Sequence, residues 1–415
     1  MSSLRDVRAP KPDPNKPTTH PSDPQHNIDY VEDSVICYVA GHNLVMYDQV
    51  EKRQKFVHGS EDAFSISSMA LCPNKKYVAV AERGEALAVF VYNIRTCRKY
   101  KKLQYDKWTT KEIVNMAFSA DNQLLLTLGG APDWSLLCWN WNKAKVLSKV
   151  QISEHYPVYQ TSFSPVDASV ACVSGKDRLS FYRVLDNELR SIPSSTLENT
   201  NVLCHAWLKQ PEDHMIIGTD DGDLIVYEKS SLLCRLSQAP KHLPKSEDDI
   251  LESTISIESI VALSKGFVAG CSNATFRLYT LVQDRPTSAT DMFACIQTWK
   301  VNDHSAEVMS MSMSPNEDTL MCVLGDNQIF HCSMISPSNL KNEDVKTVMC
   351  KFHGPGAITG MDLCVRKPLV ATTGMDRSIR IWNYLDFKLE MVSENQPEPF
   401  SPPATSVCGL LVCLK

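Results

Sequence analysis

The sequence lacks the features that mark several large classes of protein. No apolar run reaches the roughly 18 residues of a transmembrane helix. The segment 1–26 carries charged residues and prolines but no apolar run, so it is not a secretory signal peptide. The formal net charge is −6, so neither nucleic acid nor an anionic membrane is an expected partner. The 43% of hydrophobic residues and 22% of charged residues are typical of a globular protein with a core.

The cysteines lack the spacing of a metal or redox site. None of the 15 cysteines forms a Cys-x-x-Cys pair. Most of them lie within short apolar runs, as Cys37, Cys172 and Cys322 do. This placement is typical of free, buried cysteines in a reducing compartment. We therefore expect no metal site, no disulfide framework, and a location in the cytoplasm or cytoskeleton.

Motifs of common enzymes are missing as well. The chain has no Gly-x-Ser-x-Gly motif, and Gly129 and Gly130 form an isolated pair without the Lys of a phosphate-binding loop. His58, His205 and His304 lie near the starts of repeated units, but no carboxylate or nucleophile recurs beside them. We interpret these histidines as structural. The sequence predicts no catalytic residue, no cofactor and no enzymatic activity.

The sequence does contain an internal repeat of short apolar strands. Pro73, Ala120 and Pro165 mark the same point in three successive units, which gives a period of about 45 residues. The third strand of a unit usually ends in an aromatic residue, as in 89–92, 137–139, 179–182, 224–227, 276–279 and 379–382. Helical solenoids of similar period would show a spacing of about 3.6 residues, and this chain does not. The repeat predicts an all-β protein, a WD-repeat β-propeller with four strands in each blade.

Seven full units precede the C-terminal segment, and an incomplete unit comes before them. The full units are 66–104, 113–150, 158–192, 202–237, 257–300, 308–352 and 357–392. The incomplete N-terminal blade has strands near 35–40, 43–47 and 55–57 and lacks an innermost strand. Because an open ring would leave unpaired sheet edges, we expect a closed ring of seven or eight blades, with the apolar run 407–414 as a candidate for the missing strand.

These counts divide the chain into three parts. Residues 27–394 form the predicted propeller. Residues 1–26 are a Pro-rich segment that we expect to be disordered, and residues 395–415 are a Pro-rich linker followed by an apolar tail.

The last unit matches the WD-repeat pattern best. In that family a loop His, a turn Asp, a strand Ser or Thr and a Trp form a buried hydrogen-bond network. The resemblance implies that His353, Asp376, Trp382 and either Thr372 or Thr373 form this network here. Its role would be structural, because a buried carboxylate and a buried imidazole must each be paired.

A run of basic residues lies near the end of the first full unit. It falls on the outermost strand and the adjoining loops, and consists of Arg95, Arg98, Lys99, Lys101, Lys102 and Lys107. Outer strands carry Lys and Arg to prevent pairing between sheet edges, which is one interpretation. The other is contact with an acidic partner, since edge protection needs fewer charges than these.

Several segments resemble one family of WD-repeat proteins. They are 54–61, 116–119, 157–165, 218–222, and above all 358–372 with 380–384. In this order they resemble the family of cilia- and flagella-associated protein 57, which are components of the axoneme. The resemblance runs from about Gln54 to Leu389. Family members are longer, with a second propeller and a coiled coil, so we expect this chain to be a short or truncated form.

The resemblance implies a function in motile cilia and flagella. We expect a non-catalytic scaffold that helps to assemble or dock inner dynein arms on axonemal doublets and so regulates beating. Its partners would be dynein-arm or doublet components, with tubulin as a candidate, and neither nucleic acid nor a membrane. The alternative is a generic cytoplasmic WD-repeat adaptor in a multiprotein complex.

Overall fold

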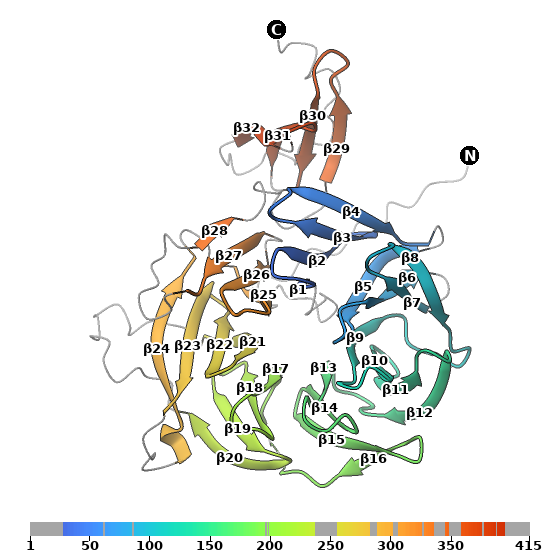
Figure 1. Cartoon of the computed structure of the whole chain (residues 1–415), viewed down its shortest axis with the longest axis vertical. Helices are drawn as coiled ribbons and strands as arrows, with labels where there is room; N and C mark the ends of the chain where they lie inside the picture. The colour runs from blue at the N-terminus through green and yellow to red at the C-terminus, as the bar shows by residue number, and fades with distance from the viewer. Residues whose placement is uncertain are drawn as a thin grey trace, which may run out of the picture.

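The computed structural model describes residues 28–60, 63–84, 87–195, 197, 199–236, 255–282, 289–301, 306–325, 328–335, 345–347, 358–375, 377–386 and 388–394. This part of the chain forms eight antiparallel sheets of four strands each. Figure 1 shows seven of them, β1 to β28, arranged around a central space, with the eighth outside. We number the sheets in chain order and call the first seven the propeller body. The predicted all-β architecture of four-stranded blades is confirmed.

The first four sheets follow one another along the chain. Sheet 1 has β1 (Ile28–Tyr30), β2 (Val35–Ala40), β3 (Asn43–Asp48) and β4 (Arg53–His58). Sheet 2 has β5 (Ala63–Leu71), β6 (Tyr77–Gly84), β7 (Ala88–Asn93) and β8 (Arg98–Leu103). Sheet 3 has β9 (Ile113–Phe118), β10 (Leu124–Gly129), β11 (Ser135–Asn140) and β12 (Lys145–Gln151). Sheet 4 has β13 (Val158–Phe163), β14 (Val170–Gly175), β15 (Arg178–Leu185) and β16 (Glu188–Ile192).

The remaining sheets repeat this arrangement. Sheet 5 has β17 (Val202–Trp207), β18 (His214–Thr219), β19 (Leu224–Glu228) and β20 (Ser231–Leu236). Sheet 6 has β21 (Ile257–Leu263), β22 (Gly266–Cys271), β23 (Thr275–Leu281) and, after the short helix η2 (Ala289–Asp291), β24 (Phe293–Lys300). Sheet 7 has β25 (Val308–Met313), β26 (Thr319–Leu324), β27 (Ile329–Ser333) and β28 (Val345–Thr347). Sheet 8 has β29 (Ile358–Leu363), β30 (Leu369–Gly374), β31 (Ser378–Asn383) and β32 (Lys388–Glu394).

Burial along the strands explains why they form. The second strand of a sheet is covered on both faces, so β10 and β18 are almost continuously apolar and buried. The fourth strand has neighbours on fewer sides, so β12 and β20 combine exposed residues with partly or fully buried ones. The apolar clusters of the propeller body each combine residues of two neighbouring sheets. The core is therefore a set of interfaces between sheets and not one central core.

Side chains of the inner strands link neighbouring sheets. The side-chain oxygen Oδ1 of Asn115 on β9 accepts a hydrogen bond of 3.1 Å from the backbone N–H of Thr161 on β13. The Gln160 side chain on β13 in turn accepts from the backbone N–H of His205 at 2.8 Å and donates to its carbonyl oxygen at 3.0 Å. Asn115 and Gln160 are both the third residue of their strand. This shared position fixes how adjacent inner strands lie against each other.

Sheets 1 and 7 also pack together, although they are far apart in the sequence. The Ser312 hydroxyl on β25 donates to the carboxylate of Asp29 on β1 at 2.9 Å. The backbone N–H of Tyr30 donates to the Ser312 oxygen at 3.2 Å. One apolar cluster combines Ile28 and Tyr30 of sheet 1 with Met321 of sheet 7. The two sheets at the ends of the propeller body are thus neighbours in space.

The prediction of an incomplete N-terminal blade is wrong, because sheet 1 has four strands. Its innermost strand is β1, which pairs with β2 through partners such as Tyr30 and Ile36. Three residues are too few to show a period in the sequence, so this strand was missed. The segments 1–26 and 395–415, including the apolar run 407–414, lie outside the described residues.

Sheet 8 corresponds to the last predicted unit and stands outside the propeller body (Figure 1). Its buried cluster has two members, Ala371 and Ile381. Several of its apolar side chains face solvent, among them Met361 at 68% and Val365 at 100% exposure. The strand pattern of a blade is therefore present here without the packing that the other blades have.

Candidate interaction surfaces

The structure places two of the four predicted WD-network residues in contact. The Trp382 indole N–H on β31 donates a hydrogen bond of 2.7 Å to the Thr372 hydroxyl on β30. The neighbouring Thr373 hydroxyl lies 3.1 Å from that of Thr359 instead. His353 and Asp376 lie outside the described residues, so the complete network stays a prediction.

Sheet 3 contains the same pair, which the sequence analysis missed. The Trp139 indole N–H on β11 donates to the Thr127 hydroxyl on β10 at 3.0 Å, and both residues are fully buried. In each sheet the threonine is the fourth residue of the second strand and the tryptophan the fifth of the third strand. These shared strand positions are the signal by which the pair in sheet 3 could have been predicted from the sequence.

A carboxylate anchors the turn of the same sheet. Asp133 accepts hydrogen bonds from Lys149 at 2.7 Å and from Ser135 at 2.8 Å. Burial opposes ionisation of this carboxyl group, but the two hydrogen bonds and the charge of Lys149 outweigh it. The pKa of Asp133 therefore lies below its usual value. The arrangement holds the turn to the outer strand, which is a structural role.

The three candidate histidines have different surroundings. His205 is buried between sheets 4 and 5, with Nε2 at 2.6 Å from the Ser162 hydroxyl and Nδ1 at 2.7 Å from the Ser174 hydroxyl. The Trp207 indole N–H also donates to Ser162, at 2.8 Å. Hydroxyls both donate and accept, so they suit the two nitrogens of a neutral imidazole. His58 is exposed and lies 2.7 Å from Asn43, and His304 is outside the described residues.

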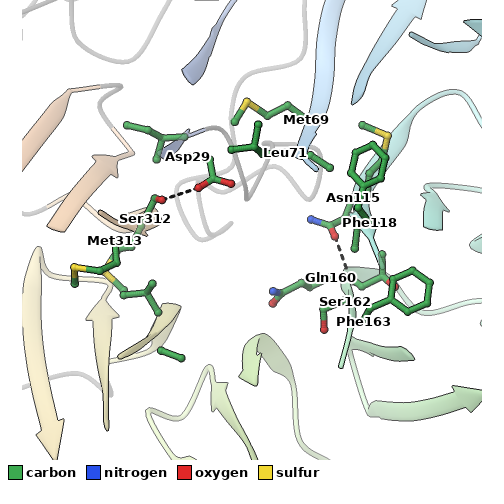
Figure 2. Close-up of a pocket in the computed structure, with 18 of the residues that line it drawn as sticks. Asp29, Met69, Leu71, Asn115, Phe118, Gln160, Ser162, Phe163, Ser312 and Met313 are labelled. Atoms are coloured by element: carbon green, nitrogen blue, oxygen red, sulfur yellow. Dashed lines mark hydrogen bonds between the residues drawn. The ribbon is translucent and has the colours of Figure 1, made fainter. Parts of the chain in front are cut away.

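A cavity of about 540 Å³ opens at one end of the central space. Figure 2 shows Asp29, Met69, Asn115, Gln160 and Ser312 around it, each from a different inner strand. Its two lysines have partners. The Lys75 ammonium donates to the Tyr30 carbonyl oxygen at 2.7 Å, and the Lys209 ammonium donates to Glu317 at 2.6 Å. The cavity therefore combines amide, hydroxyl and apolar groups with two cations that already link sheets, Lys75 between sheets 2 and 1 and Lys209 between sheets 5 and 7.

The predicted basic run lies on the outer edge of sheet 2. Arg95 is in the turn before β8, Arg98, Lys99, Lys101 and Lys102 are on β8, and Lys107 follows it. All except the half-buried Lys101 are exposed. Among the described residues, none of these cations forms an ion pair within 4.0 Å. The Lys99 ammonium instead lies 3.7 Å from the centre of the Phe90 ring. This edge is thus a basic surface whose cations form no ion pair in the described part of the chain.

Two further kinds of site are absent from the described residues. These residues contain no group of three or more His, Cys, Asp or Glu side chains placed to hold a metal ion. They also contain no helix with the length and apolar character needed to cross a membrane.

The sheets and their order define the class of protein, a WD-repeat protein with a propeller-like fold. The family model of the WD domain, G-beta repeat, matches residues 346–383, which include most of sheet 8. The solved structure of U3-55K is similar with a TM-score of 0.55 and 14% identity, over 73% of this chain and 89% of that chain. At this identity the likeness concerns the fold alone.

Several proteins with a similar sequence are cilia- and flagella-associated proteins. The chain is 30% identical to cilia- and flagella-associated protein 57 of Mus musculus, over 91% of this chain and 33% of that protein. It is 26% identical to cilia- and flagella-associated protein 57 C of Tetrahymena thermophila, over 87% and 33%. Cilia- and flagella-associated protein 44 of Mus musculus is 21% identical, over 86% and 19%. The chain is a homologue of cilia- and flagella-associated protein 57, as the resemblance predicts, and spans a third or less of the length of these curated relatives.

Proposed function

We propose that this protein is a non-catalytic scaffold of motile cilia and flagella that helps to dock inner dynein arms on axonemal doublets. The observation that carries the proposal is the similarity to cilia- and flagella-associated protein 57, which extends over 91% of the chain. The fold supports it, because packed sheets present preformed surfaces that lose little conformational entropy when a partner binds. We also infer that sheets 1 and 7 complete a closed ring of seven blades, based on their shared apolar cluster.

Axonemal partners would be dynein-arm or doublet components, with tubulin as a candidate. The basic edge of sheet 2 supports an acidic partner, since its exposed cations have no ion pair among the described residues. We propose that Arg95, Lys99 and Lys102 take part in such a contact.

Location tests this function directly. The tagged full chain should remain with axonemes when motile cilia are extracted with detergent, and axonemes without it should lose part of their inner-arm dynein heavy chains. Protein found only in the cytosol of ciliated cells would contradict the proposal and favour the alternative, a generic cytoplasmic adaptor. Retention on axonemes with a full set of inner arms would keep the location but remove the dynein-docking role.

A further inference from the structure

A groove of about 600 Å³ separates the turns of sheets 1 and 2. This volume lies within the roughly 300–1,000 Å³ typical of ligand pockets. Buried apolar side chains form its floor, with Val31 and Met46 from sheet 1 and Ile94 from sheet 2. The groove can therefore receive an apolar side chain from a partner. We call it the interblade groove.

The rim of the interblade groove is unevenly charged. Two of its carboxylates are already engaged: Glu51 pairs with Arg53 at 3.3 Å, and Asp48 accepts backbone hydrogen bonds of 2.9 and 3.0 Å. Three exposed cations, Lys55, Lys76 and Arg95, also line the groove. Among the described residues these three form no ion pair. The described lining thus carries five cations, with Arg53 and Lys75 included, against the three carboxylates of Glu32, Asp48 and Glu51, so its balance is positive.

Strand β8 extends this positive rim. Lys102 is paired with Phe90 and Lys99 with Tyr92 in the register of β7 and β8. Phe90 and Tyr92 belong to the apolar cluster shared by sheets 1 and 2, so both lysines lie on the side of sheet 2 that faces sheet 1. Lys101 is paired with Val91, whose cluster faces sheet 3, and so lies on the other side.

Edge protection explains this charge less well than a ligand does. It needs charge only on the outer strand itself, whereas here cations from two sheets and three turns or strands line one cavity. Some outer-strand cations elsewhere are paired, such as Lys149 with Asp133 and Arg190 with Glu188, whereas Lys145 on β12 has no ion pair among the described residues but does not line this cavity.

We propose that the interblade groove binds an acidic peptide segment of a partner protein, with an apolar side chain on the floor and carboxylates on the rim. This proposal depends on the proposed scaffold function in one respect, that the partner is expected on the axoneme. A nucleic acid fits less well, because its evenly spaced phosphates would meet Glu32 and Asp48 as well as the cations, whereas a peptide can place its carboxylates beside the cations alone. None of the described residues that line the groove is aromatic, so the groove offers no ring for base stacking.

Fluorescence anisotropy of the full chain with a labelled peptide of Glu-Glu-Leu repeats tests the proposal. We expect the peptide to bind at low salt, and to bind several-fold more weakly as salt rises from about 0.05 to about 0.3 M. The double variant Lys55→Gln with Arg95→Gln should weaken binding about fivefold or more, because two exposed charges are lost without removing any buried group. A peptide of Gln-Gln-Leu repeats should bind weakly to both proteins.

The matched control is the double variant Lys143→Gln with Lys145→Gln. These two exposed lysines lie at the outer edge of sheet 3, the edge that corresponds to the basic edge of sheet 2. This control should bind the acidic peptide as the parent does, and both variants should melt at the parent temperature. Equal binding by the parent and the groove variant would overturn the proposal, as would tighter binding of single-stranded DNA than of the peptide. A parent protein that is found on axonemes but does not bind the peptide would contradict the groove proposal and not the scaffold function. A protein that binds the peptide but is found only in the cytosol would contradict the scaffold function and support the groove proposal.

Discussion

The buried Thr127–Trp139 pair permits a quantitative test of the packing inside sheet 3. Thr127→Val keeps the shape of the side chain but removes the acceptor that lies 3.0 Å from the indole nitrogen of Trp139. Both residues are fully buried, so water cannot replace the lost partner. An unpaired buried donor costs about 1–3 kcal/mol, and we expect the free energy of unfolding to fall by this amount. Trp139→Phe should cost about 2–4 kcal/mol, because it leaves a cavity and an unpaired hydroxyl.

The double variant separates the hydrogen bond from the packing. With both polar groups gone, neither is left unpaired, so the double variant should be about 1–2 kcal/mol more stable than the sum of the single effects implies. Urea denaturation followed by circular dichroism measures all four proteins. The control combines Thr127→Val with Trp207→Phe, which lies two sheets away and should add to within about 0.5 kcal/mol. Additive effects for the Thr127–Trp139 pair would refute the hydrogen bond as a stabilising contact.

Three shorter predictions concern Asp133, Ser162 and two cysteines. Asp133→Asn should lower the melting temperature at neutral pH, and this difference from the parent should shrink as the pH falls below about 3.8, because the lowered pKa of Asp133 gives stability that is complete above the unfolded value and is lost as the pH falls through the folded value. Ser162→Ala should cost about 1–3 kcal/mol in urea denaturation, since it leaves the Trp207 indole N–H unpaired, and Ser162→Thr should restore part of this. Burial raises the pKa of Cys138 to about 12, so a thiol reagent should modify the half-buried Cys97 in the native protein and Cys138 only after denaturation.

The repeated strands could be predicted because burial repeats with them. The second and third strands of each blade are covered on both faces, so the sequence shows apolar runs such as β10 and β18 at a regular distance. The three-residue β1 gives no such signal, and its place depends on contacts with Ser312, which is far away in the sequence. The position of sheet 8 was equally invisible. Its strands pair in the same order as those of the other blades, and this pairing does not depend on neighbouring sheets, so the sequence does not show that sheet 8 stands apart.

The candidate surfaces, too, could be predicted only in part from the sequence. The Thr372–Trp382 contact follows a known sequence pattern, whereas Thr127–Trp139 lies in a blade whose loops depart from that pattern. The basic run on β8 was visible, but its division between two sides was not. Residues three apart on a regular strand face opposite sides, yet a bulge between the partners of Val91 and Tyr92 places Lys99 and Lys102 on the same side. Only the register shows this.

Net charge and local charge give different answers for this protein, and the local charge decides what binds. The chain carries a net charge of −6, which by itself predicts repulsion of an acidic partner. At physiological salt, however, charges more than about 8 Å away are largely screened. A partner at the interblade groove is therefore influenced mainly by Lys55, Lys76 and Arg95 on the rim and by the nearby β8 lysines, and not by the carboxylates of the opposite blades. An acidic segment would be attracted to the groove, so the local charge would orient the partner as well as hold it.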